Sequence, residues 1–280
     1  MTMVQATNRR SAMRPPQRAA RDPDKSGRAG LVQSLSRGLG LLDSLAESPD
    51  GISLCDLSQQ VGLSVSTAHR LLTTLEQQGY VRCHHGTRHW SIGVQAFIAG
   101  SAFVKARDLL EIARPRMRGL MEESGETVNL AVLDGGEAVF LAQVECRQMM
   151  RALAPPGVRA PLHCSGVGKA LLAALPEAEV GRILRQHGLP RLTPRTLTTV
   201  ARLRADLERT RESHYAMDDQ ERSIGLRCVA AVVFDEHREQ VGAVSLSGPV
   251  VRIPDERIAI LGDLVHKTAQ AITSAYSGNR

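Results

Sequence analysis

Leucine spacing marks where regular structure is expected to begin in this chain. Steps of three and four residues predict an amphipathic helix that ends near Pro49, with an apolar stripe at Leu35, Leu39, Leu42 and Leu45. Residues 1–30 have no apolar period and are rich in Arg, Pro, Ala and Asp. Their composition predicts a disordered basic arm in front of a first domain at residues 31–93.

Two short helices joined by a glycine turn are predicted next, at about residues 53–78. Ser53 can cap the first helix, with Asp56 at the capping-box position, and Gly62 supplies the turn. Ser64 can cap the second helix, whose apolar stripe consists of Ala68, Leu71, Leu72 and Leu75. This pattern is typical of a helix-turn-helix.

The opposite face of the second predicted helix is polar and carries a single long cation. Ser66, Arg70, Thr73 and Gln77 lie on this face, and Thr67, His69 and Thr74 flank it. A helix that enters the DNA major groove needs donors and a cation of this kind, because it approaches phosphates and reads base edges. A plain solvated helix face is the alternative interpretation.

A basic hairpin is predicted directly after this helix. Residues 80–83 and 88–92 have strand patterns, and residues 84–87 form a turn between them. Such a hairpin is a wing, in which Arg82 and Arg88 could contact the phosphate backbone. The adjacent His84 and His85 lack nearby cysteine or acidic ligands, which favours an exposed loop over a metal site.

The rest of the chain predicts a helical connection and then a sheet with helices. Residues 94–107 are interpreted as a helical linker within a helical pattern that reaches residue 124, with Pro115 expected to break or kink it. Residues 108–280 form the second domain. Strands are predicted at 127–133, 138–145, 148–153, 228–234 and 241–248, and helices at 166–175, 177–187, 200–213 and 255–276. The predicted fold class is α+β, with helices covering the sheet.

The placement of charge supports nucleic-acid binding by the first domain. Of 280 residues, residues 1–106 hold 12 Lys and Arg against 7 Asp and Glu, whereas residues 107–280 hold 23 against 22. The basic excess therefore lies in the N-terminal third, where phosphates would be met. An aromatic content of 3% argues against a single-strand binder that stacks bases on aromatic side chains.

Two further features limit the class of protein. The five cysteines are widely spaced and include no C-x-x-C, so neither a disulfide framework nor a structural zinc site is expected. No apolar run approaches the roughly 20 residues that span a bilayer. We therefore expect a cytoplasmic protein without a membrane partner.

The sharpest feature of the second domain is a run of small residues that leads into a helix. Gly166 and Val167 would open that helix, and the first backbone N–H groups of a helix form a cradle for anions. Ala170 follows Lys169, so the P-loop pattern is absent and a carboxylate is favoured over a nucleotide. A glycine turn needed only for packing is the alternative.

Catalysis is not expected. Cys164 and His163 are neighbours in sequence, but adjacency alone does not make a nucleophile–base pair. The chain has no G-x-S-x-G or H-E-x-x-H motif, and nothing in it calls for a cofactor.

Several segments together resemble the IclR-type transcriptional regulators. Residues 34–39, 62–72 and 79–81 resemble the DNA-binding half of that family, and residues 125–127, 161–169, 225–231 and 245–249 resemble its effector half. The resemblance runs in family order from about residue 31 to 277.

The resemblance implies a winged helix-turn-helix joined to a GAF/PAS-like effector domain with a largely antiparallel sheet. It implies double-stranded operator DNA as a partner, dimers through the DNA-binding domains, and tetramers formed by pairs of dimers. The implied effector is a small oxo acid of the glyoxylate or pyruvate type. The implied pocket residues are Met149, Ala152, Ala160, Gly166, Val167, Asp218, Leu226, Cys228, Ser245 and Ser247.

Some alternatives remain open at this stage. The small Ala152 and Ala160 would also suit a larger aromatic or hydroxy acid. Asp218 would repel a carboxylate unless it is protonated or accepts from a hydrated aldehyde, and the sequence does not decide between these. An architectural DNA binder whose second domain only oligomerises, and a carboxylate-metabolising enzyme with a DNA-binding domain, are alternatives from other classes.

Overall fold

The computed structural model describes residues 31–105, 109–152 and 154–278, so the predicted arm at residues 1–30 lies outside the described residues. The chain divides into two compact units, residues 1–100 and residues 101–280. Among the described residues, no helix is long and apolar enough to cross a membrane.

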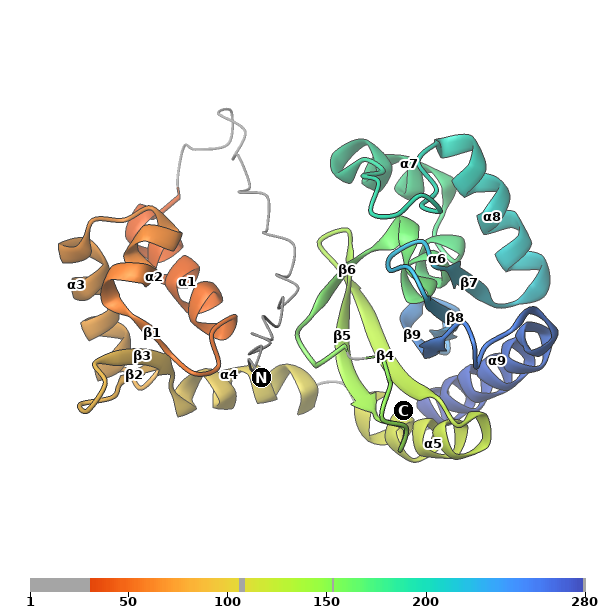
Figure 1. Cartoon of the computed structure of the whole chain (residues 1–280), viewed down its shortest axis with the longest axis horizontal. Helices are drawn as coiled ribbons and strands as arrows, with labels where there is room; N and C mark the ends of the chain where they lie inside the picture. The colour runs from red at the N-terminus through yellow and green to blue at the C-terminus, as the bar shows by residue number, and fades with distance from the viewer. Residues whose placement is uncertain (1–30, 106–108, 153, 279–280) are drawn as a thin grey trace, which may run out of the picture. The chain divides into compact units, whose positions relative to one another are not determined.

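The first unit is a winged helix-turn-helix, as predicted (Figure 1). Its elements are α1 (Gln33–Ala46), β1 (Ile52–Ser53), α2 (Leu54–Val61), α3 (Val65–Gln77), β2 (Val81–Cys83) and β3 (His89–Ile92). The strands form an antiparallel sheet in the order β1-β3-β2, in which β2 and β3 are the predicted wing. The short strand β1 was not predicted.

Local side-chain chemistry sets the ends of α2 and α3. The Ser53 hydroxyl accepts from the backbone N–H of Asp56 at 3.2 Å and donates to the Asp56 carboxylate at 2.7 Å. Gly62 ends α2 in the left-handed region, with φ of +68°. The Ser64 hydroxyl accepts from the N–H of Thr67 at 3.3 Å and so caps α3. These caps and the turn are the ones predicted from the sequence.

Helix α1 forms where the leucine spacing predicts it, but a different face is buried. The buried residues are Gly38, Leu41 and Leu45, whereas Leu35 and Leu39 are 62% and 53% exposed. The predicted stripe was therefore wrong in its first half. The unit's core needs only the C-terminal half of α1, which packs on Leu57, Leu72 and Trp90.

The second unit is built on one antiparallel sheet with the strand order β6-β5-β4-β9-β8-β7. Helix α4 (Val94–Lys105) precedes it, and its elements in chain order are α5 (Leu109–Ser124), β4 (Thr127–Asp134), β5 (Glu137–Val144), β6 (Arg159–Pro161), the short 3-10 helix η1 (Leu162–Cys164), α6 (Gly166–Ala173), α7 (Glu177–His187), α8 (Val200–Ser213), β7 (Ala216–Asp219), β8 (Leu226–Phe234), β9 (Gln240–Pro249) and α9 (Asp255–Ser277). The predicted α+β class with a helix-covered, largely antiparallel sheet is confirmed.

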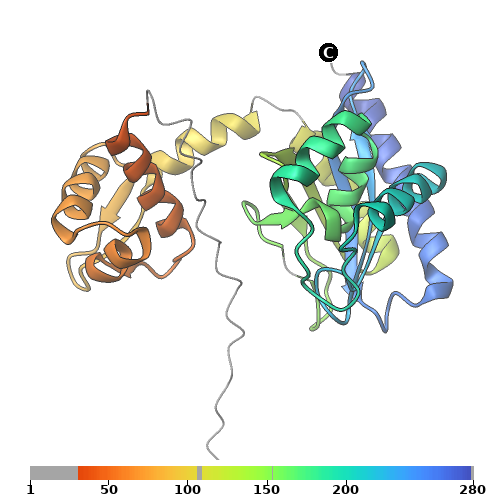
Figure 2. The ribbon, with the colours of Figure 1, turned by 90° about the horizontal axis from the view of Figure 1, so that it is seen from above.

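Helices cover both faces of this sheet, as Figures 1 and 2 show. Helices α5 and α9 pack on one face through Met117, Leu261 and Val265, together with strand residues such as Leu130 and Leu246. Helix α6 packs on the other face against small residues, chiefly Ala131, Ala230 and Ala243. Because strand side chains alternate between faces, the polar residues of the middle strands lie under α6.

One prediction in this unit was wrong in part and another was wrong. Helix α5 is not broken at Pro115 but continues through it, although proline removes one backbone donor there. Residues 148–152 form no strand, and residue 153 lies outside the described residues. Met149 and Met150 there are 99% and 68% exposed, so this apolar run is not buried against the sheet. The edge strands are instead β6 and β7, which were not predicted.

Candidate DNA-binding and anion-binding sites

The predicted polar face of α3 is open to solvent. Ser66, His69 and Arg70 are exposed, and Thr67 and Thr73 are partly exposed. Within the described residues Arg70 makes no ion pair, so its guanidinium is free for a phosphate or a base edge. The Ser64 hydroxyl contacts the Ser66 and Thr67 hydroxyls at 3.2 and 2.8 Å, which places a cluster of hydroxyls at the start of the helix.

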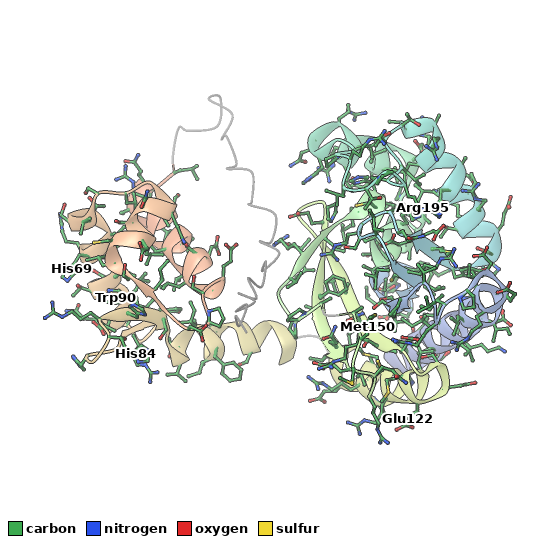
Figure 3. All side chains as sticks on the ribbon, viewed as in Figure 1. His69, His84, Trp90, Glu122, Met150 and Arg195 are labelled. Carbon is green, nitrogen blue, oxygen red and sulfur yellow. The ribbon has the colours of Figure 1, made fainter. Side chains whose placement is uncertain are left out.

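His69 connects this face to the wing (Figure 3). Its ring packs edge-on against Trp90, with ring centroids 6.4 Å apart and planes at 88°. Trp90 is only 5% exposed and belongs to β3. An edge-to-face pair of this kind stabilises the position of both rings. His69 therefore has a packing role in addition to its predicted place on the DNA-facing surface.

The wing is fixed to α3 and presents its two arginines to solvent. The Glu76 carboxylate accepts from the backbone N–H of Cys83 at 2.9 Å, which joins the end of α3 to β2. His84 lies 2.9 Å from the Ser91 hydroxyl across the hairpin. Arg82 and Arg88 are exposed, as phosphate contacts require.

The second candidate site lies at the N-terminus of α6. Ser165 caps this helix by accepting from the N–H of Gly168 at 3.2 Å. The N–H groups of Gly166 and Val167 have no partner within the helix. Gly166 lies against β8: a Cβ at this position would be 2.8 Å from the Cys228 sulfur and 3.1 Å from the Cys228 carbonyl oxygen. Glycine is therefore required for this approach of helix to sheet.

Strand register brings the predicted polar residues beneath these amides. Asp218 on β7 pairs with Cys228 on β8, and Cys228 pairs with Ser247 on β9. Directly opposed residues share a face of the sheet. Ser245 lies two residues from Ser247 along β9 and so shares this face as well. The four side chains therefore gather under the start of α6, although they come from three strands.

One buried hydroxyl in this group has only a thiol beside it. Ser245 is fully buried, and within the described residues its oxygen has no nitrogen or oxygen partner, while the Cys228 thiol interacts with it weakly. Ser247, in contrast, accepts from the Asn129 amide at 3.2 Å, and Gln143 donates to the Asn129 carbonyl at 2.8 Å. A buried polar group without a partner is costly and is rare in native proteins. This hydroxyl therefore points to a ligand.

Asp218 is a buried acid whose pKa lies close to physiological pH. It is 2% exposed, and its Oδ1 accepts from the N–H groups of Glu221 and Arg222 at 2.7 and 3.4 Å. Burial raises the pKa of Asp218 to about 7, and the negative Glu221 adds to the rise, whereas these N–H groups and Lys169 oppose it. At pH 7 about half of the molecules carry a proton here.

Lys169 occupies an unexpected position one turn into α6. Its side chain is fully buried, and its ammonium lies 2.6 Å from Glu221 and 2.8 Å from Asp206 on α8. These two carboxylates raise the pKa of Lys169 although burial itself lowers it, so the group stays charged. The sequence marks this lysine only by the absence of a P-loop pattern, and nothing local in it predicts a place near the site.

The cysteines near the site are not nucleophiles. Burial raises the pKa of Cys164 and of Cys228 to about 12, and in each case Asp218 adds to the rise. The Gly166 amide and the Ser245 hydroxyl oppose the rise in the pKa of Cys228. The Cys228 thiol therefore lies among the residues proposed to bind the ligand. Both thiols are neutral at physiological pH.

The remaining predicted pocket residues are placed unequally. Ala160 on β6 is fully buried in the same apolar cluster as Val167, and Leu226 begins β8 on the face that carries Cys228. Ala152 is partly buried in the connection before β6. Met149 is 99% exposed and is not brought to the site.

Sequence reasoning missed several polar residues around the site. Glu221, Asn129 and Gln143 were not singled out, yet each is hydrogen-bonded to a predicted site residue or to its partner. A signal existed for Asn129, because it is a polar residue within the apolar run of β4. No local pattern marks Glu221, whose role depends on contacts across the fold.

Comparisons with known proteins cover both units. A family model described as the IclR helix-turn-helix domain matches residues 34–84, and one described as the C-terminal part of the bacterial transcriptional regulator IclR matches residues 101–274. The structure is similar to that of the IclR protein of Thermotoga maritima, with a TM-score of 0.72 and 29% identity, over 87% of this chain and 98% of that one.

Two curated relatives are more similar in sequence. The chain is 51% identical over 253 residues to the transcriptional repressor IclR of Escherichia coli strain K12. It is 50% identical over 253 residues to the acetate operon repressor of Salmonella typhimurium strain LT2. Each alignment covers 90% of this chain and 92% of the relative.

Proposed function

This chain belongs to the IclR family of bacterial transcriptional regulators. We propose that it is a repressor whose affinity for operator DNA is controlled by a small oxo carboxylate of the glyoxylate or pyruvate type. The observation that carries the ligand assignment is the fully buried Ser245 hydroxyl, which has no nitrogen or oxygen partner within the described residues and lies near the amides of Gly166 and Val167. An anion there would satisfy the hydroxyl and the amides together. The family assignment sets aside the enzyme alternative.

The two named repressors support a proposal for the regulated genes. The acetate operon repressor at 50% identity supports control of acetate use, and hence of the glyoxylate bypass, by this chain as well. A small oxo acid as the ligand would make repression depend on the concentration of a metabolite of that pathway. Operator binding places the working protein with the chromosome, in the cytoplasm.

The DNA-binding part of the proposal assigns α3 to the major groove. Ser66, Thr67, His69, Arg70 and Thr73 would face base edges and phosphates, and Ser64 would fix the start of the helix. Arg82 and Arg88 of the wing would contact the phosphate backbone.

Self-association through the first unit is supported by its exposed apolar side chains. Leu35 and Leu39 of α1, and Val94, Phe97 and Ile98 of α4, are between 51% and 72% exposed. Exposed apolar groups of this size are typical of surfaces that bind another protein. We assign them to a dimer of the DNA-binding units, and the second units to the contact that joins dimers into tetramers.

The test uses the full chain and a duplex selected by the protein from random sequences. Binding to that duplex is measured by fluorescence anisotropy at fixed salt with pyruvate, glyoxylate or benzoate present. We expect the two oxo acids to shift operator affinity at least fivefold and Ser245→Ala to remove the shift, since a ligand acts only through its different affinities for two states.

Other outcomes of this experiment discriminate between the alternatives. A response to benzoate alone would keep the family and the site but assign a larger effector, which Ala152 and Ala160 would accommodate. Sequence-neutral binding with a steep salt dependence and no ligand response would instead support an architectural DNA binder.

A further inference from the structure

The turn after β7 connects the proposed anion site to a buried ion cluster. Glu221 donates its backbone N–H to Asp218 at 2.7 Å, and its side chain accepts from the Lys169 ammonium at 2.6 Å. The Glu221 carbonyl oxygen accepts from the Thr196 and Thr193 hydroxyls at 2.6 and 3.2 Å. Both of these threonines are buried. Glu221 is therefore fixed at its backbone and at its side chain.

The buried cation in this cluster does not neutralise Asp218. Lys169 is shared between Glu221 and Asp206, and Asp206 is also paired with the exposed Arg209. Within the described residues Asp218 makes no ion pair and accepts only backbone N–H groups. A buried carboxylate beside a second carboxylate, with no cation of its own, is favoured in its neutral form. A carboxylate ligand under α6 would add a further negative charge nearby.

We propose that Glu221, held in place by Lys169, is a positioning residue for effector binding: it keeps Asp218 a neutral hydrogen-bond donor, so that each bound carboxylate enters the site together with a proton. Asp218 Oδ1 already accepts two N–H groups, so its protonated Oδ2 donates to an acceptor oxygen of the ligand. The proposal rests on the proposed function, because it concerns the same site. It adds that the ligand must present such an acceptor, as the oxo group of a 2-oxo acid does.

The charged and titratable groups around Asp218 come from several elements. They are Lys169 from α6, Glu221 and Arg222 from the turn after β7, Cys228 from β8, and Cys164 from η1. Both thiols are neutral at physiological pH, and Lys169 is charged throughout. Burial raises the pKa of Glu221 as well, and the paired Lys169 opposes that rise. Asp218 is the carboxyl of this set that no cation pairs with, so its charge is the one that a bound carboxylate would change most.

The test is calorimetric titration of the full chain with pyruvate at pH 6 and pH 8, in buffers that differ in ionisation enthalpy. Protonation of Asp218 near pH 7 predicts uptake of roughly 0.9 proton per pyruvate at pH 8, and affinity about tenfold weaker at pH 8 than at pH 6. Asp218→Asn keeps a donor without titrating, so we expect affinity that does not depend on pH and no proton uptake.

The variant Glu221→Gln tests the positioning role directly. Loss of the negative charge should move the pH midpoint of pyruvate affinity down by about one unit, with Gln still able to accept from Lys169. The matched control is Asp219→Asn: this neighbouring carboxylate faces the other way and pairs with Arg227 and with Arg195, which Figure 3 labels. The control should leave the midpoint unchanged.

The outcomes separate this inference from the proposed function. Pyruvate binding at pH 8 without proton uptake, or an unchanged midpoint in Glu221→Gln, would overturn the role of Glu221 while leaving the anion site intact. No binding of pyruvate or glyoxylate at pH 6 by a chain that still binds DNA would overturn both. Thermal unfolding of each variant shows that the fold is retained.

Discussion

The polar face of α3 and the polar site under α6 differ in which groups complete their hydrogen bonds when no DNA or ligand is bound. On α3 the guanidinium of Arg70 is exposed, and the Ser66 hydroxyl is exposed beside the Ser64 hydroxyl, so water can complete their hydrogen bonds. Under α6 the hydroxyl of Ser245 and the carboxyl of Asp218 are buried, so only protein or ligand can do so. Burying polar groups costs free energy that exposed ones do not incur.

This difference predicts how each site responds to change. Substitutions on α3 should alter DNA affinity and leave folding nearly untouched, because surface side chains contribute little to stability. Substitutions under α6 should alter ligand affinity, stability and pH dependence together. The experiments that follow test whether the two sites separate in this way.

The largest effect is expected for Gly166→Ala. Its Cβ would lie 2.8 Å from the Cys228 sulfur and 3.1 Å from a backbone oxygen, so α6 must shift away from β8. We expect pyruvate affinity to fall at least about 100-fold by calorimetry, since the amides would move from the site. Gly119→Ala on α5 is the control, because a Cβ there meets open space. Unchanged pyruvate binding would show that the α6 amides do not hold the ligand.

Arg70→Ala should have the next largest effect, and on DNA alone. The guanidinium makes no ion pair within the described part of the chain, so its loss should leave the free energy of unfolding within about 0.5 kcal/mol of the wild type. Operator affinity should fall about 10- to 100-fold, as for the loss of a base-edge contact. Arg202→Ala, an exposed arginine on α8, is the control. Equal affinity of Arg70→Ala and wild type would remove Arg70 from the DNA-reading set.

The first site could be predicted from sequence because it is local. Caps at Ser53 and Ser64, a turn at Gly62 and one apolar stripe are set by residues within a few positions of one another. The same reasoning failed for Leu35 and Leu39, because periodicity shows that a helix has an apolar face but not what covers it. In this unit the core does not reach them.

The second site could be predicted only in part. The small residues before α6 are a local signal, and the family resemblance supplied Asp218 and Ser245. The contacts of Lys169 with Glu221 and Asp206 join residues 52 and 37 positions apart, so no period in the sequence reveals them. The edge strands β6 and β7 were missed for a similar reason: each is 3 or 4 residues long, and each is defined by its partner strand.

Stability should depend on pH through the second site. The folded-state pKa of Asp218, about 7, lies above its unfolded value, so the folded state binds more protons between about pH 4 and pH 7. Its contribution is therefore present at low pH and lost as pH rises through 7, by about 1 kcal/mol between pH 6 and pH 8. Urea unfolding at the two pH values measures the loss, which Asp218→Asn should abolish. An equal loss in Asp218→Asn would assign it to other groups.

The smallest effect is expected at His69. Unlike the other α3 residues, His69 should contribute to both DNA affinity and stability. Its ring packs edge-on against the buried Trp90, so His69→Ala should lower the free energy of unfolding by about 0.5–1 kcal/mol, whereas His69→Phe keeps the ring pair and should not. Operator affinity of both variants is measured on the same duplex, with His85→Ala in the exposed wing turn as the control. We expect His69→Phe to weaken binding a few-fold, since it lacks the ring nitrogens that can bond a base or phosphate. Full affinity in His69→Phe, with a loss only in His69→Ala, would make His69 a support of the wing and leave DNA reading to Ser66 and Arg70.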